Sequence, residues 1–206
     1  LGNYDYAVYD PNNPSDVSQP ASLSATEDKV ILGSSIPTWF GGFDNTFTYK
    51  AFDLSLFFRF SGGNEIMNAT RQDMLNMDFA NNGTEILGRW KSAAEPGDGQ
   101  TPILYVGEGG VLNTEQEASS RFVESGDFLK LSNITLGYTL PKALLNKVKI
   151  QNLRFYVTGY NLFCITNYSG YDPEVSTIRK TNLTPGVDYS AYPKSRQFVI
   201  GVNLNF

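Results

Sequence analysis

Histidine is absent from the 206 residues, and cysteine occurs once, at Cys164. Without an imidazole, the sequence excludes every Ser-His-Asp or Cys-His catalytic arrangement and every His-ligated metal site. A single cysteine also excludes an intrachain disulfide. We therefore expect no catalytic residue, no metal and no cofactor, and we interpret Cys164 as a small apolar packing residue.

Charged residues and long apolar runs are also scarce. Charged residues make up 18% of the chain and the net charge is -5, which argues against a nucleic-acid partner because phosphate binding needs clustered Lys and Arg. No run approaches the roughly 20 apolar residues of a membrane helix. Leu1 to Tyr9 has neither the basic nor the apolar region of a signal peptide, so none is expected there.

Aromatic residues are abundant, at 14%, and most of them fall in segments that alternate apolar and polar residues. This period of two predicts β-strands. The predicted strands lie near 38–49, 52–61, 121–140, 152–165 and 195–206. Their lengths suit a tilted membrane-spanning strand of roughly 9–11 residues better than a globular strand of about 5–6.

The segment 121–140 breaks its own alternation. Ile134, Leu136 and Tyr138 share one face, whereas Leu129 and Leu131 have the opposite parity. A β-bulge, or a strand that runs beyond the bilayer, would explain the shift.

The connections alternate between long and short. The long ones are 1–37, 62–120 and 166–194, and the short ones are 50–51 and 141–150, with helical turns expected at 68–77, 85–91 and 141–147. Outer-membrane barrels have long extracellular loops and short periplasmic turns. With a periplasmic C-terminus, every long connection is extracellular, so we predict an all-β fold of antiparallel transmembrane β-barrel strands.

Such a barrel would have two different faces. Polar side chains on one face are expected to line the lumen: Asp44, Asp53, Arg59, Arg154 and Tyr156. Aromatic side chains are expected to form girdles at the two membrane boundaries. The outer girdle would contain Trp39, Phe40, Phe122, Tyr168 and Tyr171, and the inner one Tyr49, Phe52, Tyr138 and Phe206.

Four motifs then carry a family resemblance. They are Gly41-Gly-Phe-Asp-Asn-Thr-Phe-Thr-Tyr-Lys50 with Phe52-Asp-Leu-Ser55, Phe128-Leu-Lys-Leu-Ser-Asn-Ile-Thr-Leu-Gly-Tyr-Thr-Leu-Pro-Lys142, Gly159-Tyr-Asn-Leu-Phe163 with Tyr168-Ser-Gly-Tyr-Asp-Pro-Glu174, and Tyr192-Pro-Lys-Ser-Arg196. In this order they resemble the SusC/RagA family of TonB-linked outer-membrane proteins. The resemblance implies that 1–206 is the C-terminal part of a large, plugged, 22-stranded barrel.

The same resemblance implies partners and a location. Family members import oligosaccharides or peptides through the bacterial outer membrane, working with a SusD-like surface lipoprotein. They contact the TonB complex through N-terminal segments that are absent from this sequence. The C-terminal residues Phe198, Ile200, Gly201, Leu204 and Phe206 resemble the signal that the barrel-assembly machinery reads, although a lipid-facing strand would need the same alternation.

Aromatic residues in the long connections are candidate substrate-binding groups. Trp90, Tyr105, Tyr168 and Tyr171 could stack on sugar rings or pack against a partner protein. Packing within the loops is an equal alternative. A calcium site at Asp10 to Asp16 is left open, because Pro14 and Ser15 depart from the EF-hand pattern.

Two other functional classes remain as alternatives. A passive porin-like channel would share the barrel but would not require a plug or TonB. A soluble β-sandwich that binds carbohydrate would instead bury the aromatic face against a second sheet. The porin therefore differs from an importer in its lumen, and the β-sandwich differs in what covers the aromatic face.

Overall fold

The computed structural model describes residues 29–76, 82–103, 105–107, 110–112, 119–146, 150–175, 177 and 185–206. They divide into two compact units. The strand unit comprises Ser34–Ile66, Glu124–Gly186 and Ala191–Phe206, and the loop unit comprises Leu1–Gly33, Met67–Val123 and Val187–Ser190. The calcium loop considered at Asp10 to Asp16 lies outside the described residues.

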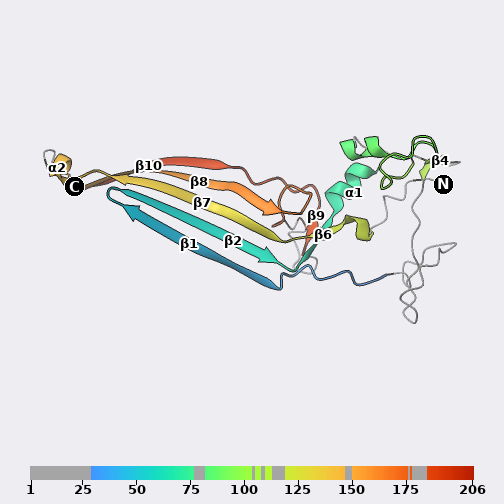
Figure 1. Ribbon diagram of the computed structural model, residues 1–206, viewed down its shortest axis with the longest axis horizontal. Coiled ribbons are helices and arrows are strands. Elements are labelled where there is room, and N and C mark those ends of the chain that lie inside the picture. Colours follow the sequence, from blue (N-terminus) through green and yellow to red (C-terminus); the bar gives the residue numbers. More distant parts are fainter. Residues whose placement is uncertain are drawn as a thin grey trace. The chain divides into compact units, whose positions relative to one another are not determined.

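The strand unit contains a five-stranded antiparallel sheet with the order β1-β2-β7-β8-β10 (Figure 1). The strands are β1 (Trp39–Tyr49), β2 (Phe52–Gly62), β7 (Phe128–Thr139), β8 (Asn152–Thr166) and β10 (Gln197–Asn205). Each long strand pairs with the long strand that follows it in the chain. The short links therefore lie at one end of the sheet and the long connections leave from the other, as the alternating connection lengths predicted.

The segment 121–140 differs from the single strand that its sequence predicts. It is divided into η3 (Ser120–Phe122), β6 (Val123–Ser125) and β7. The backbone turns at Gly126 and Asp127, where the Gly126 N–H donates to the Asn64 carbonyl oxygen at 2.8 Å. The Asp127 carboxylate in turn accepts from the Gly63 N–H at 2.7 Å. These two bonds stop the pairing of β7 at Phe128.

Of the two explanations for the parity shift in 121–140, the register of the strands supports the β-bulge. The register of β2 against β7 shifts between Phe57 and Phe58, which leaves Ser132 as the extra residue of β7. Leu131 consequently pairs with Phe58 and lies on the same face as Ile134, despite the odd spacing. At the same level of β8, Asn161 and Leu162 have no paired residue in β7, and the φ of Asn161, 53°, lies in the left-handed region.

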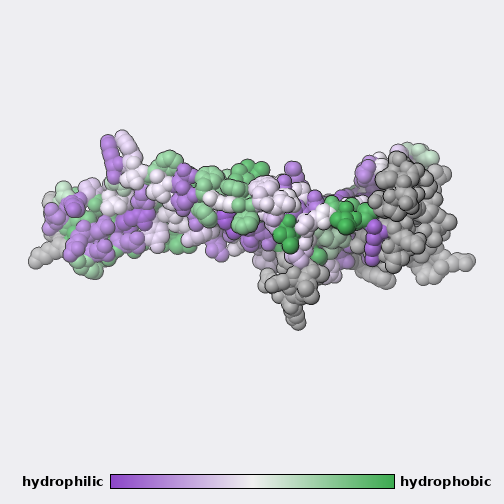
Figure 2. Space-filling model, turned by 90° about the horizontal axis from the view of Figure 1, so that it is seen from below, coloured by the Kyte–Doolittle hydropathy of each residue, from purple (hydrophilic) through white to green (hydrophobic). Residues whose placement is uncertain are grey.

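The apolar face of this sheet is exposed. Its exposed side chains include Trp39, Phe43, Phe47, Tyr49, Phe52, Leu136, Phe155, Val157, Phe163, Ile165, Phe198, Ile200, Val202 and Leu204. They contact one another across the strands, as in the stacked rings of Phe43 and Phe58 at 5.0 Å. Figure 2 shows hydrophobic side chains at the surface over the strands. No described layer of this unit covers the face.

The loop unit contains shorter elements. They are α1 (Ala69–Leu75), η1 (Thr84–Gly88), β4 (Tyr105–Gly107), β5 (Gly110–Leu112) and β9 (Val187–Asp188), while β3 (Glu65–Asn68) enters it from the strand unit. Leu75 and Phe122 are its fully buried apolar side chains. The helical turns predicted at 68–77, 85–91 and 141–147 correspond to α1, η1 and α2 (Lys142–Leu145). No described helix is long and apolar enough to cross a membrane.

Candidate functional site

The polar face of the five-stranded sheet carries a bidentate ion pair. The Arg154 guanidinium donates from Nε to Asp53 Oδ1 at 3.0 Å and from Nη2 to Asp53 Oδ2 at 2.5 Å. Arg154 is on β8 and Asp53 on β2, with β7 between them. Arg59 and Arg154 thus lie on the same face as Asp53, as the alternation predicted.

Glycine makes this cross-strand pair possible. Gly137 of β7 lies opposite both Asp53 and Tyr156, and a Cβ there would overlap the Arg154 guanidinium and the Asp53 carboxylate. A second glycine, Gly201 of β10, leaves room for the Tyr156 ring in the same way. Side chains thereby cross a neighbouring strand and cover its backbone, which fixes the pairing of the strands.

A buried charged cluster lies nearer the end of the sheet from which the long connections leave. Lys130 Nζ of β7 contacts Asp172 Oδ1 at 3.0 Å and Glu174 Oε2 at 2.5 Å, and its side chain is 5% exposed. Lys194 Nζ contacts the same two carboxylates at 3.4 and 3.1 Å. Arg59 completes this group, which we name the Lys130 cluster, with an Nη2 to Glu174 Oε2 distance of 2.9 Å.

The two carboxylates of the Lys130 cluster are stabilised in their charged form. Burial by itself would raise the pKa of Asp172, but the Glu174 backbone N–H and the Lys130 ammonium donate to it and outweigh burial, so its pKa is lowered. Burial opposes ionisation of Glu174 as well. Hydrogen bonds from Lys130 and Lys194 prevail there and lower the pKa of Glu174.

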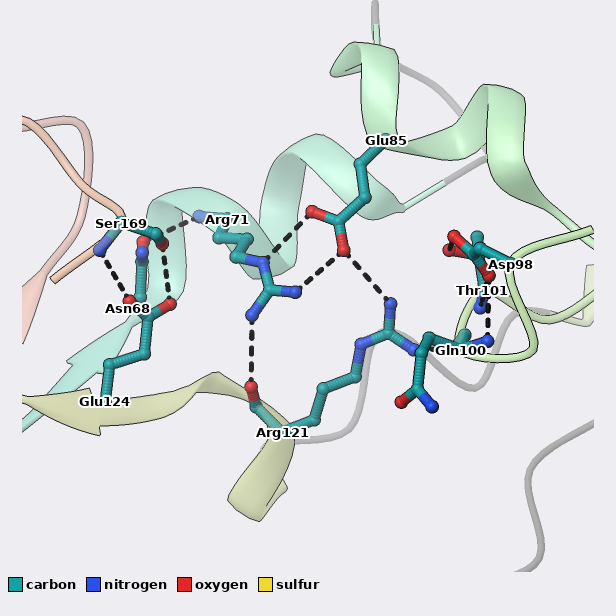
Figure 3. A network of polar contacts seen from close by, with 9 residues as sticks. All are labelled: Asn68, Arg71, Glu85, Asp98, Gln100, Thr101, Arg121, Glu124 and Ser169. Carbon is teal, nitrogen blue, oxygen red and sulfur yellow. Dashed lines mark hydrogen bonds and ion pairs between the residues drawn. The ribbon is translucent and has the colours of Figure 1, made fainter. Parts of the chain in front are cut away.

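The cluster fixes one long connection to the sheet. Residues 168–174 carry both carboxylates, while Lys130 and Arg59 belong to β7 and β2. The same connection is held at Ser169, whose N–H and hydroxyl both donate to the Glu124 carboxylate at 2.8 Å (Figure 3). Ion pairs and hydrogen bonds therefore hold this part of the connection to the strand unit, and its buried carboxylates have cationic partners.

The loop unit has its own polar network around Arg71 of α1. The Arg71 guanidinium donates to both Glu85 oxygens, at 2.7 and 3.1 Å, and to the Arg121 carbonyl oxygen at 3.2 Å (Figure 3). The Arg121 guanidinium approaches the same carboxylate at 3.4 Å. At the start of the helix, Asn68 accepts from the Arg71 N–H at 2.9 Å and so acts as the N-cap.

The candidate substrate-binding aromatics occupy different environments. Tyr171 is 74% exposed and Tyr168 is 5% exposed. Trp90 is half-buried, and the side chain of Tyr105 lies outside the described residues. Tyr171 is therefore available to a ligand, whereas Tyr168 packs inside the connection. Their role in substrate binding stays a prediction.

Two of the aromatic residues expected at the outer girdle lie elsewhere. Phe122 is 1% exposed and Tyr168 is buried too, because both pack within the long connections. The aromatic residues at the short-link end lie together on the apolar face, as the 4.7 Å distance between the Phe52 and Tyr138 rings shows. Interface aromatics must be exposed, so Phe122 and Tyr168 do not fit this role. Trp39, Phe40 and Tyr171 are exposed, and their place at the outer girdle stays a prediction.

The C-terminal residues lie on β10, at one edge of the sheet. Phe198, Ile200 and Leu204 are exposed on the apolar face, while Gly201 lies beneath Tyr156 on the polar face. Phe206 follows the strand and is exposed. The alternation is present as predicted, and recognition by the assembly machinery stays a prediction.

The Lys130 cluster was not predicted from the sequence. The sequence features that belong to it are a lone lysine within the apolar run Phe128 to Leu131 and an acidic pair separated by one proline in the connection after β8. Neither half indicates the other, because 42 residues separate Lys130 from Asp172. Among the described residues, no group of three or more acidic, Cys or His side chains could hold a metal ion.

Comparisons with known proteins agree with this geometry. No family model matches the chain. Over 88% of its length it is 34% identical to TonB-dependent receptor P3 of Formosa agariphila, and over 87% it is 28% identical to TonB-dependent receptor SusC of Bacteroides thetaiotaomicron. It covers 18% and 16% of these relatives. A chain of the RagAB peptide transporter matches 98% of it, with 26% identity and a TM-score of 0.76, and 22% of that chain is covered.

Proposed function

Because the chain belongs to the SusC/RagA family of TonB-dependent receptors, we propose that it forms the C-terminal barrel section of a SusC-like importer of oligosaccharides or peptides. Receptors of this family are integral proteins of the bacterial outer membrane, and they are transporters and not enzymes. The chain spans about a fifth of the length of the relatives it matches.

The exposed apolar face of the five-stranded sheet carries this proposal. A soluble β-sandwich would cover such a face with a second sheet, yet side chains such as Phe198 and Ile200 are 71% and 83% exposed. Lipid is the environment that suits a tall apolar band on antiparallel strands of this length. The opposite, polar face would then line the lumen of a large plugged barrel.

The rest of the receptor would supply what a transporter also needs. A plug that closes the barrel and a segment that contacts the TonB complex belong, in this proposal, to the remaining four fifths of the length. Two edges of the sheet, at β1 and β10, have unpaired backbone groups in the described sheet. Other strands of the barrel would pair with them, and recognition of the β10 signal would bring the assembly machinery to that edge.

A SusD-like lipoprotein would be the partner at the extracellular side. RagAB, a chain of which this chain resembles, is a peptide importer, and the long connections of this chain leave one end of its sheet. Exposed Tyr171 lies in one of them, next to the anchored Asp172. An aromatic ring on a fixed support suits either a partner surface or a substrate.

Fractionation of cells that produce the full-length receptor tests the proposal. We expect the receptor in the outer membrane, copurifying with a lipoprotein, and we expect its deletion to stop uptake of an oligosaccharide or peptide nutrient. A passive porin would allow uptake that continues without TonB. Recovery of the full-length protein in the soluble fraction would contradict the barrel and favour a soluble carbohydrate-binding module.

A further inference from the structure

At the end of the sheet that carries the short links, a row of aromatic rings crosses four strands on the apolar face. The register pairs Tyr49 with Phe52 and Phe52 with Tyr138, and Tyr138 is paired in turn with Phe155. Tyr49 and Phe52 are 70% and 50% exposed. Girdles of exposed aromatic rings lie at the headgroup level of outer-membrane barrels. Within the barrel proposed above, this aromatic row therefore marks one membrane boundary.

Two exposed lysines lie just beyond the aromatic row. Lys50 is in the link between β1 and β2, and its Nζ lies 5.3 Å from the centre of the Tyr49 ring. Lys142 begins α2, in the link between β7 and β8 (Figure 1). The two links are adjacent, because the Thr139 N–H donates to the Ala51 carbonyl oxygen at 2.8 Å. Both lysines therefore lie at the same end of the sheet.

Acidic residues are missing from the sequence around these lysines. The segments 45–52, 139–152 and 203–206 contain four lysines and no Asp or Glu, and two of the lysines, at 147 and 149, lie outside the described residues. The Asp53 carboxylate is bound to the Arg154 guanidinium at 3.0 Å, which neutralises it. No ion pair of the described residues includes Lys50 or Lys142.

The opposite end of the same sheet neutralises its lysines internally. There, two carboxylates contact the buried Lys130 ammonium, at 3.0 and 2.5 Å. The Lys194 ammonium contacts the same two carboxylates, at 3.4 and 3.1 Å. The lysines at the short links have no such partner in the described part of the chain, so an external anion is what would compensate their charge.

Exposed apolar side chains accompany the two lysines. Leu144 of α2 is 57% exposed, and Phe206, which follows β10, is 79% exposed. A lysine can keep its methylene stem against apolar surface while its ammonium reaches the polar side of a membrane boundary. The ligand that matches both kinds of group is an amphiphile with acyl chains and an anionic head.

We propose that the short-link end of the sheet binds the headgroups of anionic phospholipids, with Lys50 and Lys142 at the phosphate and with Tyr49, Phe52 and Leu144 against the acyl chains. This surface rests on the barrel section proposed above, because only a barrel brings this end of the sheet to a membrane boundary. Each lysine favours the anionic lipid about fivefold, the effect of one basic side chain near an anionic membrane surface.

The test uses the full-length receptor in lipid vesicles, with a fluorescent reporter beside Lys142. In a cysteine-free background that includes Cys164→Ser, a bimane label is attached to Ala143→Cys, and Ala143 is exposed. The vesicles are phosphatidylcholine with a small fraction of a quencher lipid, either phosphatidylglycerol or phosphatidylcholine with a nitroxide near the top of one acyl chain. We expect the phosphatidylglycerol quencher to be several-fold more effective at low salt. The preference should shrink at about 1 M salt, where the Debye length is about 3 Å.

Paired substitutions assign the preference to the two lysines. Lys50→Gln combined with Lys142→Gln removes both charges and should lose most of the preference for phosphatidylglycerol. Lys50→Arg combined with Lys142→Arg keeps both charges and should keep the preference. Lys91→Gln is the control elsewhere in the chain: Lys91 is exposed too, but it is paired with Glu95 at 3.1 Å, so its substitution should change nothing at the label.

Two results would overturn the headgroup surface: the two quencher lipids act equally on the unchanged receptor, or the paired glutamine variant keeps the preference in full. In both cases lipid still quenches the label, so the barrel and the importer proposal stand. A label that neither lipid quenches, on a receptor recovered in the soluble fraction, would overturn the barrel and this surface with it.

Discussion

In the strand unit, five long strands are joined by backbone ladders and keep apolar side chains such as Leu136 on the surface, whereas the loop unit buries Leu75 and Phe122 to 1% exposure. The loop unit thus follows the ordinary rule of soluble proteins, in which apolar side chains are removed from water. The strand unit reverses that rule on one face. Within the proposed barrel, this difference means that the sheet suits lipid on its apolar face and the loop unit suits water.

Polar groups show the same contrast. The strand unit has a charged cluster in which Lys130 and Asp172 are 5% and 6% exposed. In the loop unit, Arg71 and Glu85 are 26% and 37% exposed. Buried charge depends on its partners far more than exposed charge does. Substitutions should therefore have unequal effects in the two units.

The largest effect is expected from Lys130→Met. It leaves Asp172 and Glu174 buried beside Arg59 and Lys194 alone, and breaking a buried pair costs about 3–5 kcal/mol. The free energy of opening residues 168–175 should therefore fall by up to that amount. Hydrogen–deuterium exchange of the full-length receptor measures it. Lys194→Met, whose side chain is 47% exposed, should change it by less than about 1 kcal/mol. Equal effects of the two variants would contradict the cluster.

Leu136→Arg tests the apolar face of the sheet. An arginine on the lipid side of a barrel costs about 2–4 kcal/mol near the bilayer midplane. Folding of the full-length receptor into lipid vesicles should therefore be reduced. Thr135→Arg points to the polar face and should be tolerated better, although it loses the 2.8 Å hydrogen bond to Thr158. A larger folding defect for Thr135→Arg than for Leu136→Arg would contradict the assignment of the Leu136 face to lipid.

Acidification should loosen the connection held by the Lys130 cluster, with a smaller effect than Lys130→Met because a neutral acid can still accept a hydrogen bond. Burial opposes the charge of Asp172 and Glu174, but their hydrogen bonds and cationic neighbours lower both pKa values below the ordinary 3.8 and 4.5. Their stabilisation is therefore complete above those values and is lost as the pH falls through the lower, folded values.

The pH dependence is measurable as proteolytic protection of residues 168–175 between pH 7 and pH 3. Protection should stay constant down to the ordinary carboxyl range and fall below it. An Asp172→Asn, Glu174→Gln double variant should show weaker protection without that fall. A loss of protection already near pH 6 in the unchanged receptor would contradict the assignment.

The smallest effect is expected in the loop unit, from Arg71→Met. It removes hydrogen bonds to Glu85 and to the Arg121 carbonyl oxygen, which are worth about 1–3 kcal/mol to a local structure. Exchange of the α1 amides should speed up accordingly, while the five-stranded sheet stays protected. Lys91→Met breaks an exposed pair and should leave α1 unchanged.

The strands could be predicted because their side chains alternate, and alternation is a local property of the sequence. The same reasoning located the irregularity, since the parity of Leu129 and Leu131 conflicts with that of Ile134, but it left a β-bulge and a strand that runs beyond the bilayer as alternatives. It did not predict the break at Gly126 and Asp127. That break depends on hydrogen bonds to Asn64 and Gly63, about 60 residues away in the sequence.

The candidate site was predictable only in part. Residues on strands, such as Asp53 and Arg154, could be assigned to one face by counting. The side chains of the long connections could not, because no period relates residue number to direction there. Tyr168 is buried and Tyr171 is exposed, although both are aromatic residues of the same motif. The pairing of Lys130 with Asp172 could not be predicted, because it depends on how the connection after β8 folds back onto the sheet.

A spin-label scan of β7, in the full-length receptor reconstituted in lipid vesicles, tests most directly whether the apolar face of the sheet contacts lipid. In a cysteine-free background that includes Cys164→Ser, single cysteines would be placed from Leu129 to Tyr138. We predict that accessibility to lipid-soluble oxygen peaks at Leu129, Ile134, Leu136 and Tyr138, with the period interrupted at Ser132, while Leu131 stays low because neighbouring side chains bury it to 5% exposure. Peaks at Lys130, Asn133 and Thr135, or no alternation at all, would contradict an apolar face in contact with lipid.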